Sequence, residues 1–263
     1  MILAGFILLA VGAADLVRQF SPRRWIGYLA AAVVLLLLGS VSDAVLPMLA
    51  ALVVGALWVW CMPDDRPALA GFWPAVLLAV VAVGAVVWIG GRDHAGLIGT
   101  VWQLRSPFGE VSFDLAMLAV GVSVFLLESA NLVVRAALDG EHTWRPAEQV
   151  AETRPIPDDE PGKESEEESG QEPQAPTAVD PREGFKGGRL IGPLERLLVL
   201  ILTLAAAYPI LAAMLAAKGI VRFPEISRDG ETGARAEYFL VGSLVSWVIA
   251  LGAAFLVWWA AHS

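Results

Sequence analysis

The chain has 263 residues, of which 57% are hydrophobic and 17% are charged, whereas a soluble domain has about 45–50% apolar and about 25% charged residues. This composition argues against an ordinary soluble domain and favours an integral membrane protein. The net charge of −9 belongs to one stretch, because residues 139–187 contain fourteen acidic and five basic side chains. The single cysteine, Cys61, excludes an intrachain disulfide and a multi-cysteine metal site.

Six apolar segments are expected to cross the bilayer, whose hydrocarbon core is spanned by about 20 helical residues. In chain order they are residues 2–17, 25–39, 44–60, 69–90, 111–138 and 238–259. Arg18, Arg23 and Arg24 follow the first segment, and positive residues favour the cytoplasmic side of a membrane. The N-terminus is therefore expected outside. The first segment is expected to be a retained anchor, because a cleaved signal would carry its positive charges first.

Polar residues mark two places in the N-terminal half. Residues 91–110 carry charged and aromatic side chains and are expected to lie partly in the outer interface. Glu128 interrupts the fifth span, and Asn131 and Arg135 follow it at i+3 and i+7, which places all three on one helix face. A carboxylate inside a span is costly and often functional. Glu128 is interpreted either as a structural acid near the cytoplasmic interface, which we favour, or as a transport or proton-handling group.

Residues 139–187 separate two membrane regions, 1–138 and 188–263. This stretch is rich in Glu, Pro, Ser and Gln, and it has few aliphatic residues larger than alanine. Such a composition cannot bury enough apolar area to offset the entropy lost on ordering the chain. We therefore predict a disordered cytoplasmic linker that acts as a solvated tether, in preference to a specific docking arm.

The C-terminal region opens with residues 188–225, where charged residues flank a long uncharged run that contains Pro209. Proline suits the first turn of a helix and disrupts a helix interior. The segment is therefore either one kinked span, or a hairpin of two arms, 190–207 and 209–223, whose second arm is re-entrant or interfacial. A single crossing, which gives seven spans in all, would place the basic loop that follows outside. The hairpin returns that loop to the cytoplasm and is favoured.

The hairpin brings charged and polar side chains to one interface, where opposite charges can pair. These residues form the candidate polar site: Glu195, Arg196, Lys218, Arg222, Glu237 and Tyr238. In the last span, small residues recur at every fourth position: Gly242, Ser246, Ala250 and Ala254. A stripe of small residues lets another helix approach closely, so we expect it to be a helix-packing face.

Three motifs in this region occur in a specific order and spacing: GRLIGPLER, AAKGIVRFPEI and AEYFLVGSLVSW. Together they resemble the C-terminal membrane block of an uncharacterised family of bacterial integral membrane proteins, in some of which the block follows an N-terminal domain of unknown function. The resemblance covers roughly the last third of the chain. It implies a bacterial inner membrane location, and it implies no particular reaction.

No catalytic, metal or cofactor site is predicted, because the sequence has no zinc spacing, no phosphate-binding glycine loop and no nucleophile elbow. Nor does it have a basic patch for nucleic acid.

We expect an all-α polytopic membrane protein, with membrane lipids and a second copy or a membrane-protein partner as its contacts. The favoured function is a non-enzymatic packing or partner-binding module. A channel or transporter for a small solute or ion is the alternative, supported by the hairpin at membrane depth. A lipid-headgroup enzyme with Glu195 or Glu237 as its base ranks third.

Overall fold

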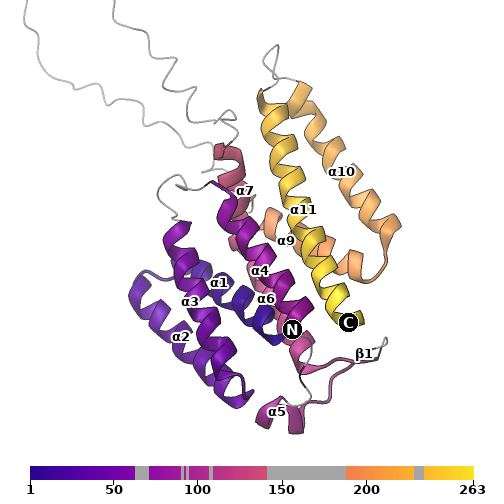
Figure 1. Cartoon of the computed structure of the whole chain (residues 1–263). Helices are drawn as coiled ribbons and strands as arrows, with labels where there is room; N and C mark the ends of the chain where they lie inside the picture. The colour runs from indigo at the N-terminus through magenta and orange to yellow at the C-terminus, as the bar shows by residue number, and fades with distance from the viewer. Residues whose placement is uncertain (63–70, 90–91, 93–94, 107–108, 141–187, 228–233) are drawn as a thin grey trace, which may run out of the picture.

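The computed structural model describes residues 1–62, 71–89, 92, 95–106, 109–140, 188–227 and 234–263 (Figure 1). The elements are α1 (Ile2–Phe20), α2 (Arg24–Val41), α3 (Val45–Cys61), α4 (Trp73–Ile89), α5 (Gly96–Val101), β1 (Arg105–Ser106), β2 (Gly109–Glu110), α6 (Phe113–Leu127), α7 (Ser129–Gly140), α9 (Gly188–Leu204), α10 (Tyr208–Ser227) and α11 (Ala234–His262). The predicted all-α class is confirmed. The exception in the described part is a two-stranded antiparallel hairpin, β1 with β2.

Several helices have the length and composition of membrane spans. These are α1, α2 and the part of α11 from Phe239 to His262, and α6 with α7 gives a fourth if the bent pair counts as one span. Three shorter apolar helices accompany them: Val45–Cys61, Trp73–Ile89 and Tyr208–Val221. The fold is therefore that of a helical membrane protein.

The fifth predicted span, 111–138, differs from the expectation of one continuous helix. Ser112 caps its start by accepting a hydrogen bond from the Leu115 amide, which satisfies one of the free N–H groups of the first turn. The helix then breaks at Glu128, and the two parts meet at 48°. Glu128 therefore does not share a regular helix face with Asn131 and Arg135. Because α7 continues to Gly140, the first two residues of the predicted linker are helical, and 141–187 lie outside the described residues.

Helix α1 is the centre of the N-terminal region. Its buried side chains include Ile2, Phe6 and Val11, and it packs mainly on α6 and α3. Two glycines let its backbone approach that of α6: a Cβ on Gly5 would lie 2.8 Å from the Leu118 amide nitrogen, and one on Gly12 would lie 2.8 Å from the Val124 carbonyl carbon. Since residue numbers rise together along this contact, α1 and α6 run parallel.

The C-terminal region contains the helix break predicted at Pro209. Helix α9 ends at Leu204, Ala206 has a positive φ of 53° in the turn, and α10 begins at Tyr208, so Pro209 lies in its first turn. Proline is tolerated there because the first N–H groups of a helix have no partner within the helix. Val199, Leu211 and Ala250 form a small buried cluster that joins α9, α10 and α11.

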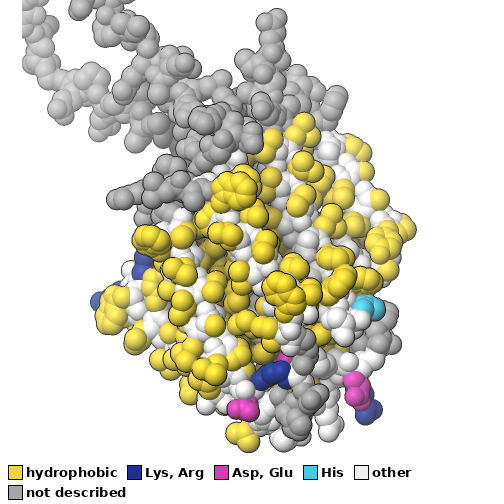
Figure 2. Space-filling view, in the orientation of Figure 1, with side chains coloured by type: hydrophobic (Ala, Val, Ile, Leu, Met, Phe, Trp, Pro, Cys, Tyr) yellow, Lys and Arg dark blue, Asp and Glu magenta, His cyan; other side chains and the backbone are white. Residues whose placement is uncertain are grey.

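The two ends of the helix bundle differ. Both chain termini lie at one end, the terminal end, whereas α7 finishes at the other, the linker end (Figure 1). On the face shown in Figure 2, hydrophobic side chains cover the middle of the molecule, and charged ones appear near the terminal end and at the left edge. Large exposed apolar residues such as Leu29, Leu77 and Ile210, each more than 60% exposed, lie on α2, α4 and α10. A surface of this kind is suited to lipid rather than water.

Candidate functional site

A closed group of polar side chains, the Asp15 cluster, lies within the N-terminal region. Asp15 on α1 is 1% exposed. It accepts hydrogen bonds from Trp58 Nε1 of α3 at 2.8 Å and from Ser129 Oγ of α7 at 2.5 Å. Its other oxygen lies 3.4 Å from the Arg18 guanidinium. One carboxylate thus contacts two other helices besides its own, and its charge is balanced within α1.

Arg18 connects this cluster to the end of α3. Its guanidinium donates to the Met62 carbonyl oxygen at 2.6 Å and also to the Val59 carbonyl oxygen. The last carbonyl groups of a helix have no partner within the helix and carry partial negative charge, so a buried cation is well placed there. Asp15, Trp58 and Ser129 were not predicted as site residues. The sequence did contain a signal, since Asp15 is the one acid in segment 2–17 and lies three residues before Arg18.

A second buried cation, Arg196 of α9, joins the C-terminal region to the N-terminal region. Arg196 is 2% exposed. It donates to the Leu126 carbonyl oxygen at 3.0 Å, to Asn131 Oδ1, and to Ser246 Oγ of α11 at 3.5 Å. Asn131 in turn donates to Glu128 Oε2 at 3.3 Å. The break at Glu128 thus lets Arg196 bind the end of α6 and the beginning of α7, a contact that a continuous helix would not offer.

An ion pair between two residues of the candidate polar site forms across the α9–α10 hairpin and is called the Glu195 pair. Lys218 Nζ lies 2.8 Å from Glu195 Oε1, and Trp247 Nε1 of α11 donates to the same oxygen at 2.8 Å. The Glu195 and Lys218 side chains are 13% and 25% exposed. Unlike the Asp15 cluster, this pair keeps some access to its surroundings.

The structure divides the candidate polar site that the sequence grouped together. Glu195 pairs with Lys218, but Arg196 binds a different set of partners on α6, α7 and α11. Arg222, Glu237 and Tyr238 belong to α10 and α11, and their side chains lie outside the described part. On the predicted packing stripe, Ser246, Ala250 and Ala254 are buried and Gly242 is half-buried, and α11 packs on α9, α7 and α6 of the same chain.

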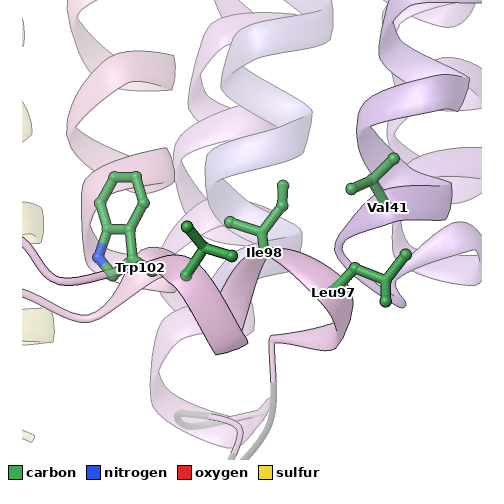
Figure 3. A pocket seen from close by; sticks show the side chains of 5 residues that line it. Val41, Leu97, Ile98 and Trp102 are labelled. Atoms are coloured by element: carbon green, nitrogen blue, oxygen red, sulfur yellow. The ribbon is translucent and has the colours of Figure 1, made fainter.

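Two further features, an arginine with four hydrogen bonds and an apolar hollow, lie at the terminal end. Arg92 clamps the N-terminus of α6 through Asp114, at 2.9 and 3.2 Å, and the α2–α3 turn through the Ser42 and Asp43 carbonyl oxygens, at 3.1 and 3.2 Å. Beside this clamp is a shallow apolar hollow of about 340 Å³ (Figure 3), lined by Val41, Leu97, Ile98, Val101 and Trp102. Its lining carries no charged side chain, so it differs in chemistry from the buried clusters.

These features define the class as a helical membrane protein with buried interhelical charges. Among the described residues, no group of three His, Cys, Asp or Glu side chains is arranged to hold a metal ion. No family model, curated protein or solved structure matches the chain. The resemblance of residues 188–263 to a bacterial membrane family therefore stays a prediction.

Proposed function

We propose that the chain is a multi-pass protein of a bacterial inner membrane with six spans and a membrane-embedded hairpin. The spans are α1, α2, α3, α4, the bent pair α6–α7, and α11, and the hairpin is α9–α10. Support comes from the three long apolar helices, the bent pair and the shorter apolar α3 and α4. At about 1.5 Å per residue, the 17 residues of α3 or α4 reach about 26 Å, which is close to the thickness of the hydrocarbon core.

The proposed orientation has the N-terminus outside and the acidic linker in the cytoplasm. Arg18, Arg23 and Arg24 then lie on the inner side, as the positive-inside rule favours. Two arginines fall outside, but each has an acidic partner: Arg92 pairs with Asp114 at 2.9 Å, and Arg105 lies 3.8 Å from Glu110. The shared end of the two termini (Figure 1) agrees with an even number of crossings.

The proposed activity is that of a non-enzymatic module that packs with membrane lipids and with a membrane-protein partner or a second copy. The observation that carries this proposal is that the buried charged side chains form hydrogen bonds between helices. Asp15, Arg18 and Arg196 each bond to groups on another helix, so their polar atoms connect helices rather than line a passage. Buried charges retained in this way can fix which helices associate, at some cost in stability.

The two membrane regions provide a direct test of this packing role. A protease site is inserted into the 141–187 stretch of the full chain, and the purified protein is cleaved in mild detergent. We expect the two fragments, which contain residues 1–140 and 188–263, to elute together, because Arg196 and the packing of α11 on α6 and α7 hold them. Arg196→Gln is expected to weaken the association, since two hydrogen bonds from a charged donor to Leu126 and Asn131 of the other fragment are lost.

The matched control is Arg105→Gln, because the Arg105 side chain is 81% exposed and its acidic partner, Glu110, belongs to the same region of the chain. The control should elute like the parent chain after cleavage. Fragments that separate from the unsubstituted chain, while each remains soluble, would contradict the packing role.

A channel or transporter for a small solute or ion is the second candidate. The specific observation in its favour is the Glu195 pair, an acid and a base on a hairpin at membrane depth with partial access to their surroundings. Polar groups at that depth often mark ion or proton pathways. Proteoliposomes loaded with a pH-sensitive dye test it: under an imposed potential, proton entry that is abolished by Glu195→Gln would favour transport over packing.

A further inference from the structure

The Glu195 pair has the composition of a binding site for an ammonium group. Lys218 Nζ lies 2.8 Å from Glu195 Oε1, 5.4 Å from the centroid of the Trp247 ring and 5.7 Å from that of the Phe239 ring. A carboxylate beside two aromatic faces attracts an ammonium cation through a charged hydrogen bond and through the quadrupoles of the rings.

The side chains that line this site and the Lys218 ammonium group that occupies it belong to different helices. Glu195 belongs to α9, and Trp247 and Phe239 belong to α11, which packs closely on α9. The Trp247 N–H donates to Glu195, so the carboxylate stays oriented without Lys218. Lys218 belongs to α10, which the described contacts join mainly to α9. The site can therefore persist when Lys218 moves away.

Helix α10 is well placed to release its lysine. Its side chains Ile210, Ile220 and Val221 are 61%, 73% and 72% exposed, and a Cβ on Gly219, the neighbour of Lys218, would meet nothing within 4 Å. Segments with few buried contacts open at low free-energy cost. A molecule in the surrounding bilayer can therefore approach the site beside α10.

We propose that Glu195, Trp247 and Phe239 bind the primary ammonium group of an aminophospholipid headgroup, and that Lys218 occupies this site in the absence of the lipid. A zwitterionic headgroup suits the exchange. Its ammonium replaces that of Lys218 on Glu195, and its phosphate accepts the displaced Lys218. Each charge then keeps an opposite partner, which matters because a partly desolvated charge without one is costly. A free amine brings no phosphate for Lys218, so the lipid is the favoured source of the ammonium.

The test is native mass spectrometry of the intact chain in mild detergent, with phosphatidylethanolamine and phosphatidylglycerol titrated separately. The two lipids share chains and phosphate, but only the first carries an ammonium group. We expect phosphatidylethanolamine to bind about tenfold more tightly or better, the order of magnitude of one charged hydrogen bond. Glu195→Gln should remove this preference, while Glu110→Gln, whose parent side chain is 85% exposed, should keep it.

A second variant keeps the proposal testable if Glu195→Gln does not fold. Trp247→Leu is expected to lower the preference several-fold, since it removes both a ring face and the N–H that orients the carboxylate. Trp259→Leu, elsewhere on α11, should leave it unchanged. Equal binding of the two lipids by the parent chain, or a preference that survives Glu195→Gln, would overturn the proposal. Free ethanolamine that binds as tightly as the lipid would overturn the lipid source.

Discussion

The Asp15 cluster and the Glu195 pair are two solutions to the same problem, that of holding opposite charges among apolar helices. In the Asp15 cluster, the carboxylate is 1% exposed and three side chains on three helices bond to it. In the Glu195 pair, the two side chains are 13% and 25% exposed, and the lysine comes from a helix that is mostly uncovered. The Asp15 carboxylate is enclosed by protein. In the Glu195 pair, Lys218 can be displaced.

The difference indicates separate roles for the two regions. A fully buried charge must keep its partner, because the energy of removing it from water is recovered only through that contact. A partly exposed pair can exchange partners, since each member can find a replacement in lipid headgroups or water. We therefore interpret the N-terminal region as a rigid frame and the α9–α10 hairpin as the part that can respond to its surroundings.

The largest expected effect comes from breaking the closed cluster. Asp15→Ala leaves the Arg18 guanidinium buried without its carboxylate, which typically costs about 3–5 kcal/mol. Unfolding in mixed micelles of mild detergent and SDS measures the loss. Glu110→Ala is the control, because the Arg105–Glu110 pair is 81% and 85% exposed, and its effect should stay within about 0.5 kcal/mol.

A double variant sharpens this result. Asp15→Ala combined with Arg18→Ala removes both charges, so it should cost clearly less than the sum of the two single substitutions. Additive effects, or an Asp15→Ala variant as stable as the control, would mean that the cluster is not a coupled unit.

A smaller effect is expected at the backbone contact of α1 with α6. A Cβ on Gly121 would lie 2.2 Å from the Gly5 carbonyl oxygen, so Gly121→Ala must push the two backbones apart, at about 1–3 kcal/mol. Gly252→Ala on α11 is the matched control, because a Cβ there meets nothing within 4 Å and alanine favours helix. Equal unfolding midpoints for the two variants would count against a rigid frame.

The smallest effect on stability is expected in the α9–α10 hairpin. Lys218→Gln removes one member of a pair that keeps access to its surroundings, so we expect a loss of about 1 kcal/mol or less in the same unfolding measurement. The insertion of the protein should not change. A loss as large as that of Asp15→Ala would show that the two regions do not differ in the way described.

Much of the helical pattern was readable from the sequence because apolar run length and proline chemistry are local signals. The helix break before Pro209 and the pairing of Lys218 with Glu195 could both be predicted from a hairpin within residues 188–225. The helix break at Glu128 could not be predicted in this way, since the residues around it include no proline or glycine. Its hydrogen-bonding partner is Arg196, which is distant in the sequence. Asp15 was counted within an apolar segment, although its charge was visible. The choice of partners between distant helices depends on packing, which helical spacing within one segment does not encode.

The proposed topology depends most on the α9–α10 hairpin, which returns the chain to the cytoplasmic side. A cysteine at Ser227, the last residue of α10, tests this in a Cys61→Ala background with a membrane-impermeant thiol reagent. We predict that Ser227→Cys is protected in intact cells and labelled only after lysis, while a control Ser263→Cys at the other end of α11 is labelled in intact cells. Labelling of Ser227→Cys in intact cells would contradict the hairpin, because it would mean that residues 188–227 cross the membrane once.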